Sequence, residues 1–392
     1  MNSQKVTLVS FSPIHRDARL LRQIKYLSPH FTVTVIGYGQ LEPPYAHLAQ
    51  MLTVPDLAER GFARKIRTLI LLTLGRILPN WAYKVWYWGR TEHQAAYALL
   101  LKSSPSIIHA NDWNTLPLAV KVAKQIGAKV ILDLHEYAPL EWENSWSWRT
   151  LNKPMIDYKL RKYLPEVSAT VTVNETIAKR YDQEYGFHPI TVMNIPEYST
   201  SATFKPTDAN HIRLIHHGGA IRERKLELMI EVLAHTDTRY TLHFMLVEAS
   251  PGYIAKLKAI AQQVAPDRIF FHQPVPPTEI VNRLTEFDMG IYLLSLTDFN
   301  HAMALPNKFF DFITAGLAIT VGPSPEMARL TQQFGFGIVA PSFEPIEVAK
   351  ALNRLTATDI DQMKLKTTET RNTLNADIEM SKLVELYESM RS

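Results

Sequence analysis

The sequence predicts an α/β protein made of two Rossmann-like, doubly wound domains that face a cleft. Short runs rich in β-branched residues alternate with helical patterns along almost the whole chain, which is typical of parallel sheets covered by helices on both faces. A length of 392 residues is also too great for one ordinary hydrophobic core. The alternation breaks once, in a polar stretch with two prolines near residues 194–211, so we expect the interdomain linker there.

The elements follow this alternation in order. In the first half we expect the strands KVTLVSF, FTVTVIG, SIIHA, KVILDL and ATVTVN, with helices that include ARLLRQIKYL, LPLAVKVAKQIG and ETIAKRYDQEY. The second half continues with IRLIHHGG, LELMIEVL, TLHFMLV, IAKLKAIAQQV, RIFFHQ, EIVNRLTEF, MGIYLL, a short helix, AITVG, EMARLTQQF, GIVA and EVAKALNRL. The expected boundaries are an N-terminal domain over 1–195, a linker over 196–211, a C-terminal domain over 212–375 and a helix over 376–392 that could cross back to the first domain.

Composition narrows the class of protein. Hydrophobic residues make up 46% of the chain and charged residues 20%, as in soluble globular proteins, and the absence of cysteine excludes disulfides and thiolate sites. No apolar run approaches the roughly 20 residues that cross a bilayer, and no secretory signal opens the sequence. We therefore expect a cytoplasmic protein. Its formal charge of +4 is unevenly spread, because residues 1–200 hold 23 Lys and Arg against 16 Asp and Glu.

The stretch ALPNKFFDFITAGLAI, residues 304–319, is the first candidate site. Pro306 and Gly316 are typical of the start and end of a helix, and Leu305 offers no side-chain cap to the first N–H groups. Those donors, together with Lys308, suit a phosphate, and Asp311 on the same face could accept from sugar hydroxyls. The alternative is a buried amphipathic helix with a Lys308–Asp311 ion pair on its surface.

The stretch HHGGAIRERKLELMI, residues 216–230, is a second candidate. Two glycines permit close approach of a ligand to the backbone, and Arg222, Arg224 and Lys225 follow before a helix. The alternative is a solvated basic loop. No GxGxxG motif follows a predicted strand, which argues against a nicotinamide or flavin enzyme.

Polar residues also follow two strands of the first domain. His109, Asn111 and Asp112 end one strand, and Asp133, His135 and Glu136 follow the next. Loops after parallel strands hold the ligands of doubly wound sheets, so we expect some of these groups to face the cleft. Turn or cap chemistry is an equally good interpretation of Asp112.

We expect no metal and no cofactor. His216 and His217 are adjacent and would point to opposite sides of a strand, and Asp359 and Asp361 lie at a predicted helix start, where capping explains them better.

Residues 59–90 combine seven cations with one acid, and Arg60, Arg64 and Arg67 recur at helical spacing. All seven tryptophans lie between residues 81 and 148. Peripheral contact with an anionic membrane and a helix packed on its own domain are both open interpretations. We expect no nucleic-acid partner.

Together and in this order, the stretches resemble the GT-B glycosyltransferases of family 4 over nearly the whole chain. PIHRDARLLRQIKYL looks like their first strand, loop and helix, with Asp17 and Arg19 matching an Asp-x-Arg pattern. IIHANDWNTLP is similar to their His-x-His-Asp loop, LDLHEYAP to their Ser-His-Glu loop, LIHHGGAIRERKLELMI to their phosphate loop and LPNKFFDFITAGLAI to their nucleotide-binding helix.

The resemblance implies a nucleotide-sugar donor in the C-terminal domain and an acceptor on the N-terminal side. Asp311 stands where the family usually places a Glu on the nucleotide ribose. The implied catalytic residues are Asp112, His135, Arg224 and Lys308. The implied donor-binding residues are Gly218, Gly219, Arg224, Asn300, Leu305, Pro306, Asn307, Lys308 and Asp311. The implied acceptor-side residues are Arg16, Asp17, His109, Asn111 and Glu136.

Two positions depart from the family pattern. Met303 stands where many members carry an earlier Glu, although a branch with an Asn before ALPNK also lacks it and Asn300 would be this chain's version. Asn111 replaces the family's second His.

The implied activity is retaining, metal-independent transfer of a sugar to a hydroxyl acceptor in polysaccharide or glycolipid biosynthesis, with UDP favoured over GDP. A catalytically weak accessory subunit and a nucleotide-sugar epimerase are the alternatives.

Overall fold

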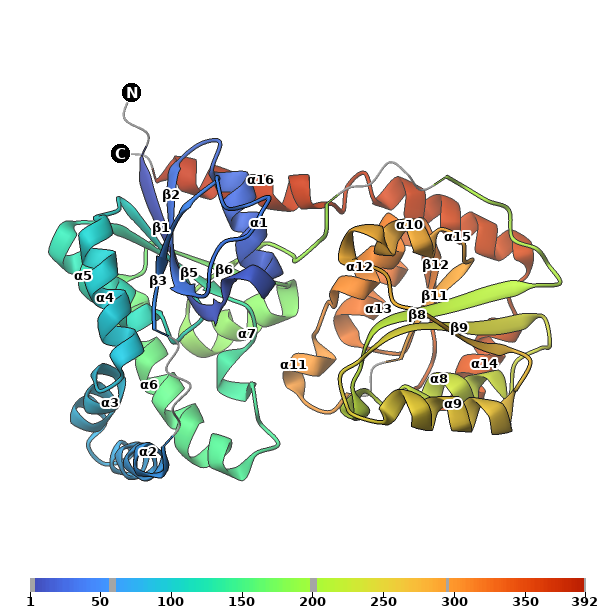
Figure 1. The fold of residues 1–392 in the computed structure, drawn as a ribbon, viewed down its shortest axis with the longest axis horizontal. Helices are drawn as coiled ribbons and strands as arrows, with labels where there is room; N and C mark the ends of the chain where they lie inside the picture. The colour runs from blue at the N-terminus through green and yellow to red at the C-terminus, as the bar shows by residue number, and fades with distance from the viewer. Residues whose placement is uncertain (1–3, 56–60, 198–202, 294–295, 391–392) are drawn as a thin grey trace. The chain divides into compact units, whose positions relative to one another are not determined.

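The computed structural model describes residues 4–55, 61–197, 203–293 and 296–390, which form two compact units. Unit 1 comprises residues 1–193, 298–300 and 380–392, and unit 2 comprises residues 194–297 and 301–379. Each unit is a parallel sheet with helices on both faces (Figure 1), so the predicted class of two doubly wound α/β domains is confirmed. Residues 59 and 60 of the basic segment and residues 198–202 of the expected linker lie outside the described residues.

The sheet of unit 1 has the order β3-β2-β1-β4-β5-β6-β7, and all of its pairs are parallel. Its strands are β1 Lys5–Pro13, β2 Thr32–Tyr38, β3 Gln50–Thr53, β4 Ile107–Asn111, β5 Lys129–Leu134, β6 Ala169–Thr172 and β7 Ile190–Thr191. Its helices are α1 Ala18–Leu27, α2 Phe62–Leu74, α3 Pro79–Trp88, α4 Thr91–Ser103, α5 Leu116–Ile126, α6 Lys153–Tyr163 and α7 Glu175–Tyr185.

The first helix shows why these residues fold as they do. Leu20, Ile24 and Leu27 recur on one face of α1 and are fully buried against the sheet. Asp17 precedes the helix and accepts from the backbone N–H of Leu20 at 3.0 Å, which satisfies one of the free donors of the first turn.

The sheet of unit 2 has the order β10-β9-β8-β11-β12-β13 and is also parallel throughout. Its strands are β8 Ile212–Ala220, β9 Tyr240–Glu248, β10 Ile269–His272, β11 Met289–Tyr292, β12 Ala318–Val321 and β13 Gly337–Val339. Its helices are α8 Glu227–Leu233, α9 Tyr253–Val264, α10 Ile280–Leu284, α12 Asn307–Thr314, α13 Pro325–Phe334, α14 Pro345–Asn353 and α15 Ala357–Thr370.

Two helices contain residues of both units. The helix α11 spans Phe299–Ala302, and α16 spans Ala376–Ser389. Met380, Leu383 and Tyr387 of α16 pack in the core of unit 1 with residues of β1 and α1.

The strand order reverses direction once in each sheet. The reversal lies between β1 and β4 in unit 1 and between β8 and β11 in unit 2. In open parallel sheets the connections diverge at such a point, and the crevice that they leave beyond the carboxyl ends of the strands is the usual ligand site. The segments after β4, β8 and β11 are therefore the places to look for function.

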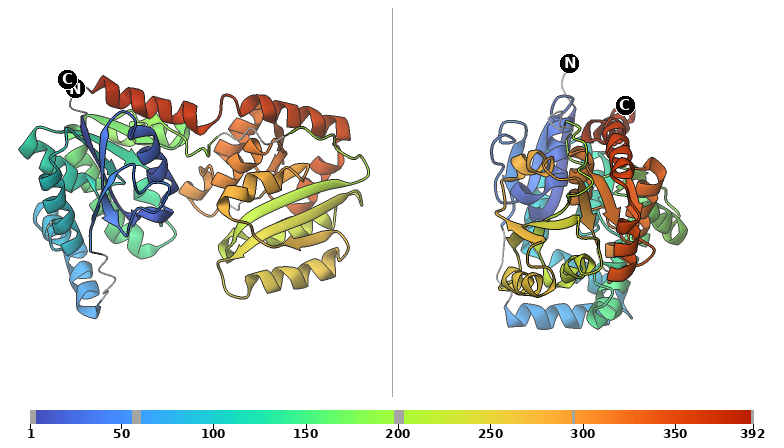
Figure 2. Two further views of the ribbon diagram at one scale, coloured as in Figure 1. Left: turned by 45° about the horizontal axis from the view of Figure 1, so that its top comes forward. Right: turned by 90° about the vertical axis from the view of Figure 1, so that its right-hand side faces the viewer.

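The helices α2 and α3 extend away from the sheet at one end of unit 1 (Figures 1 and 2). Across the described part of the chain, no helix is both long and apolar enough to span a lipid bilayer.

Candidate functional site

Lys308 lies in the first turn of α12, next to the end of β8. Its side chain is 7% exposed, and its Nζ has no hydrogen-bond partner among the residues that the structure describes. Burial, and to a smaller extent Arg224, lowers the pKa of Lys308 to about 7, while Asp311 opposes the shift. Because a buried amine without an acceptor is costly, this position suits an anion that would supply one.

The backbone of β8 makes room for this amine. Gly218 has a φ of 110°, and a Cβ built there would lie 3.0 Å from Lys308 Nζ. Glycine is therefore required both by the backbone conformation and by the approach of the lysine. Gly219 is half-buried beside it, and Arg224 follows in a short 3-10 turn before α8.

Two histidines at the end of β8 support the site from the sheet. His216 Nδ1 lies 3.0 Å from the carbonyl oxygen of Ile291, and its ring stacks on Tyr292. His217 Nε2 lies 3.4 Å from Asp311 Oδ2, and its ring meets the edge of Phe312. Burial and nearby Lys308 lower the pKa of His217 to about 3, so it is neutral at physiological pH. The alternative interpretation, a surface ion pair of Lys308 with Asp311, does not hold, because Lys308 is buried and Asp311 Oδ2 lies beside His217.

The helix itself begins one residue later than expected. Pro306, not Leu305, occupies the position before the first turn, and it provides no side-chain cap. Leu305 and Pro306 are half-buried, and Asn307 accepts a hydrogen bond from Asn194 at 3.2 Å.

Asn300 is placed differently from the other predicted donor residues. It groups with unit 1, where its Oδ1 accepts from the N–H of Tyr137 at 2.8 Å and its Nδ2 donates to the carbonyl of the same residue at 3.2 Å. The side chain is 8% exposed and its amide is held by backbone groups of Tyr137, so a contact of Asn300 with the donor stays a prediction.

In unit 1 the loops after β4 and β5 bring Asp112 and His135 together. Their Oδ2 and Nδ1 atoms are 3.5 Å apart, and the His135 backbone N–H donates to Asp112 Oδ1 at 3.3 Å. Asp112 has a positive φ of 64°, a conformation that aspartate tolerates better than most residues. The Asp112 side chain is 38% exposed, so it can meet a ligand as well as hold the turn.

His109 and Asn111 do not face an acceptor, contrary to expectation. Their side chains are 0% and 1% exposed. His109 Nδ1 lies 2.7 Å from the hydroxyl of Tyr387, and Gln23 donates to Asn111 Oδ1 at 3.3 Å. We therefore assign both residues a structural role in place of the expected acceptor contact, because their polar atoms are hydrogen-bonded within unit 1.

The buried network around these residues was missed from the sequence. Arg19 donates twice to Asp133, at 2.7 Å each, and Gln23 donates to the same carboxylate at 2.8 Å. Burial alone would raise the pKa of Asp133, but Arg19 and His109 hold it well below its usual range. The Asp-x-Arg spacing was visible in the sequence, but its partner 114 residues away was not.

The remaining acceptor-side residues lie at the surface or in a cap. Asp17 caps α1 and also accepts from Ser12 at 2.6 Å, while Arg16 and Glu136 are exposed. Glu141, which the sequence did not single out, accepts from Trp113 Nε1 at 3.0 Å. Burial and the nearby carboxylates Asp112 and Glu136 raise its pKa to about 8.

Within the described ranges, no group of three His, Asp or Glu side chains is arranged to hold a metal ion. Asp359 forms a capping box with Thr356 at the start of α15, and Asp361 accepts from the backbone N–H of Thr207. Both carboxylates therefore have structural partners.

Comparisons with known proteins bear on the family and the fold of the chain. Residues 20–196 match the family model described as Glycosyltransferase Family 4. No curated protein matches the chain by sequence. Anabaena HepE in complex with UDP has a TM-score of 0.68 at 12% identity, over 98% of this chain and 100% of that chain. HepE has also been solved with UDP-glucose.

Two further structures show the same fold. A glycosyltransferase from Rickettsia africae has a TM-score of 0.69 at 10% identity, over 100% of this chain and 99% of that chain. Sucrose-phosphate synthase from Thermosynechococcus elongatus has a TM-score of 0.68 at 12% identity, over 99% of both chains. The chain therefore has the fold of the GT-B glycosyltransferases. The match over residues 20–196 of the chain to the model of Glycosyltransferase Family 4 agrees with the resemblance seen in the sequence.

Proposed function

We propose that the protein transfers a sugar from a nucleotide diphosphate donor to a hydroxyl acceptor, with retention of the anomeric configuration. The observation that carries this proposal is the buried amine of Lys308, which has no hydrogen-bond partner among the described residues and lies beside Gly218 and Arg224 at the strand-order reversal of unit 2. UDP-sugars are the favoured donors, supported by the complexes of HepE with UDP and UDP-glucose.

The largest part of the barrier in such a transfer is the charge that builds on the leaving diphosphate. Lys308, Arg224 and the uncapped N–H groups of α12 would stabilise that charge. Asp311 would accept hydrogen bonds from the ribose hydroxyls, and its Oδ2 lies 3.4 Å from Nε2 of the neutral His217. Gly218 and Gly219 would let the diphosphate approach the backbone.

The bond exchange needs no protein nucleophile. The acceptor oxygen forms a bond to the anomeric carbon on the face from which the diphosphate departs, and a donor phosphate oxygen takes the acceptor proton. Asp112 and His135 would border the sugar and the acceptor. We propose that fixed cations replace a metal in this step.

For its setting we propose the cytoplasm, at the inner face of the membrane, in polysaccharide or glycolipid synthesis. The basic segment containing α2 and α3 would contact anionic lipid there.

The test is a thermal-shift panel of nucleotide sugars, followed by a transfer assay with the best binder in the presence and absence of EDTA. We expect UDP-sugars to stabilise the protein, a product of retained configuration by NMR, and equal rates with EDTA. Nucleotide binding without turnover on a broad acceptor panel would indicate an accessory subunit. Interconversion of the donor sugar without an acceptor would indicate an epimerase, and no binding of any nucleotide would contradict the donor site.

A further inference from the structure

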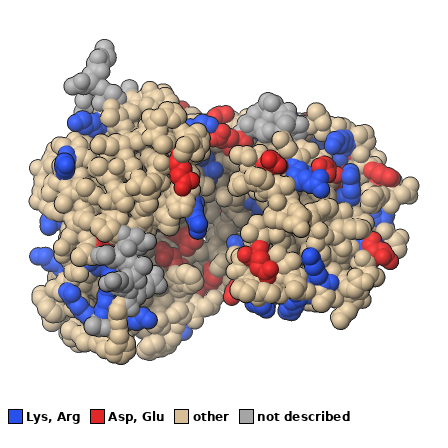
Figure 3. Space-filling view, viewed as in Figure 1, with Lys and Arg blue, Asp and Glu red and all other residues tan. Residues whose placement is uncertain are grey.

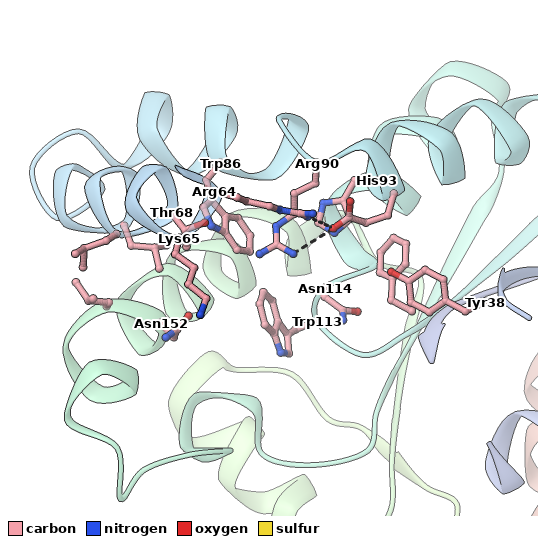
Figure 4. A pocket seen from close by; sticks show the side chains of 15 residues that line it. Tyr38, Arg64, Lys65, Thr68, Trp86, Arg90, His93, Trp113, Asn114 and Asn152 are labelled. Carbon is pink, nitrogen blue, oxygen red and sulfur yellow. Dashed lines mark hydrogen bonds and ion pairs between the residues drawn. The ribbon is translucent and has the colours of Figure 1, made fainter. Parts of the chain in front are cut away.

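A cavity of about 990 Å³ lies within unit 1, outside the residues assigned so far. Arg64 and Lys65 of α2, Trp86 of α3 and Arg90 line one side of it, and Trp113 lies on the opposite side (Figure 4). Trp113 directly follows Asp112 in the loop after β4, so the wall of the cavity includes a sequence neighbour of the residue expected beside the acceptor.

The cavity has an excess of positive charge. Glu92 accepts from Arg64 at 2.6 Å and from Arg90 at 3.3 Å, so one carboxylate serves two guanidinium groups. Lys65 makes no ion pair with any residue in the described ranges. Burial, with Lys159 and Arg90 nearby, lowers the pKa of His93 to about 3, so this wall residue is neutral at physiological pH. An anion would therefore be attracted to the cavity.

Polar atoms without partners lie in its wall and behind it. The indole N–H of Trp86 is buried and has no acceptor within the described structure, and Asn114 Oδ1 likewise has no donor. Lys159 Nζ is also buried and unpartnered, 4.3 Å from the centre of the Trp86 ring and 5.1 Å from that of Trp113. The Trp86 donor and the Asn114 acceptor in the cavity wall could therefore both bind a polar ligand, while burial lowers the pKa of Lys159 behind them.

An exposed apolar surface adjoins the cavity. Phe62 and Ile77 are each 79% exposed. The residues Phe62, Ile66, Leu69, Ile70, Ile77, Leu78 and Trp81 form what we call the apolar face of α2 and α3. Leu69 belongs to this face and also lines the cavity. Figure 3 shows Lys and Arg side chains gathered at the same end of unit 1. An apolar face flanked by cations is suited to the interface of an anionic membrane.

We propose that this cavity binds the phosphate or diphosphate group of a lipid-linked acceptor, whose hydrocarbon tail stays in the membrane beside the apolar face. Lys65, Arg64 and Arg90 neutralise the phosphate, and Trp86 donates to it. Asn114 accepts from a hydroxyl of the head group. The inference rests on the proposed glycosyl transfer, and it names the chemical class of the acceptor.

The binding test uses phosphatidylcholine vesicles that contain either polyprenyl phosphate or phosphatidylserine at equal surface charge. Wild-type protein should bind the polyprenyl phosphate vesicles more tightly. Lys65→Ala and Trp86→Phe should each weaken that preference, by about tenfold for the lysine because it loses a charge-assisted contact. Equal wild-type binding to both vesicles would mean adsorption by charge alone and would overturn the proposal.

Arg67→Ala is the matched control. Arg67 is an exposed cation of the same helix and does not line the cavity. Its loss should weaken binding to both vesicles alike, because it contributes only to surface charge. If Lys65→Ala behaved in the same way as Arg67→Ala, the phosphate would not occupy the cavity.

A third variant separates head-group binding from membrane contact. Ile70 lies on the apolar face and outside the cavity. Ile70→Asp should abolish vesicle binding but leave affinity for water-soluble geranyl phosphate unchanged. Loss of geranyl phosphate binding in this variant would place the head-group contact on the surface and contradict the cavity assignment.

Measurements of UDP affinity distinguish a failure of the lipid-phosphate site from a failure of the proposed transferase function. UDP affinity should be the same in wild type, Lys65→Ala and Trp86→Phe, since these residues belong to unit 1. If wild-type protein bound polyprenyl phosphate but no nucleotide, the transferase proposal would fail while the lipid-phosphate site stood. If UDP-sugar were transferred to water-soluble alcohols as efficiently as to a polyprenyl diphosphate-linked sugar, the acceptor class would be wrong and the transferase would stand.

Discussion

Two equally buried cations, Arg19 in unit 1 and Lys308 in unit 2, differ in whether they have hydrogen-bond partners. In unit 1, Arg19 meets Asp133 through two hydrogen bonds of 2.7 Å and donates a third to the carbonyl of Val192 at 2.8 Å. In unit 2, Lys308 is equally buried and none of the described residues accepts a hydrogen bond from its Nζ. A satisfied charge maintains the architecture, whereas an unsatisfied one is costly and is retained where a ligand completes it. Within unit 1, Arg19 and Lys159 differ in the same way, because Lys159 Nζ has no hydrogen-bond partner among the described residues.

Removing the paired cation should have the largest effect on stability. Arg19→Met leaves Asp133 buried without its main partner, and breaking a buried pair costs about 3–5 kcal/mol. We expect chemical denaturation to show this loss in the free energy of unfolding. UDP affinity of the folded variant, measured by calorimetry, should stay at the wild-type level. A variant as stable as wild type would show that the pair is not structural.

Removing the unpaired cation should affect binding instead. Lys308→Ala deletes a charge-assisted contact to the donor diphosphate, so we expect UDP affinity to fall by about 10- to 100-fold. Lys350→Ala is the control, because it deletes an exposed lysine of α14 that pairs with Glu347. Unchanged UDP affinity in Lys308→Ala would remove this residue from the donor site.

Gly218→Ala should have a smaller effect on the same site. A side chain at a φ of 110° is strained, and its Cβ would lie 3.0 Å from Lys308 Nζ. The cost is about 1–3 kcal/mol, shared between stability and UDP affinity. Gly127→Ala, at a φ of 74° with open space around it, tests backbone strain without the lysine contact. If both variants bound UDP equally well, the close approach at Gly218 would not matter for binding.

The smallest expected effect is on the pH dependence of stability, through Glu141 of unit 1. The pKa of Glu141 is raised from 4.5 to about 8, so its contribution to stability is full below pH 4.5 and is lost as the pH rises through 8. Glutamine cannot ionise, so Glu141→Gln should remove the loss of stability that ionisation of Glu141 causes at high pH. The melting temperature of the variant should therefore fall less between pH 5 and pH 9 than that of wild type. Identical slopes in the two proteins would show that Glu141 titrates normally.

The sequence predicted what depends on local spacing. Strand and helix periods gave the two α/β sheets, and Pro306 and Gly316 located α12 within one residue. It could not predict contacts made across the chain. His109 meets Tyr387 across 278 residues, so nothing near His109 indicated its burial. Likewise, the spacing showed that Lys308 and Asp311 lie on one face of the helix. It did not show that His217 of β8 lies 3.4 Å from Asp311, so that Asp311 does not pair with Lys308.

The cavity of unit 1 could not be predicted from the sequence, because segments far apart in the chain line it. The sequence of residues 59–90 indicated a basic and aromatic surface. Trp113 and Asn114 belong to the separate loop motif IIHANDWNTLP, and nothing in that motif indicated a cavity. The fold brings these segments to opposite walls of one space, which no local pattern encodes.

We expect Lys308, a buried amine, to take up a proton when the donor diphosphate binds. Its pKa of about 7 leaves it mostly neutral at pH 8, and a diphosphate beside it should restore the charged form. Titration calorimetry of UDP at pH 8, in buffers of different ionisation enthalpy, measures the protons exchanged. We predict uptake approaching one proton per UDP in wild type and none in Lys308→Met. Binding without proton uptake, or the same uptake in both proteins, would contradict the account.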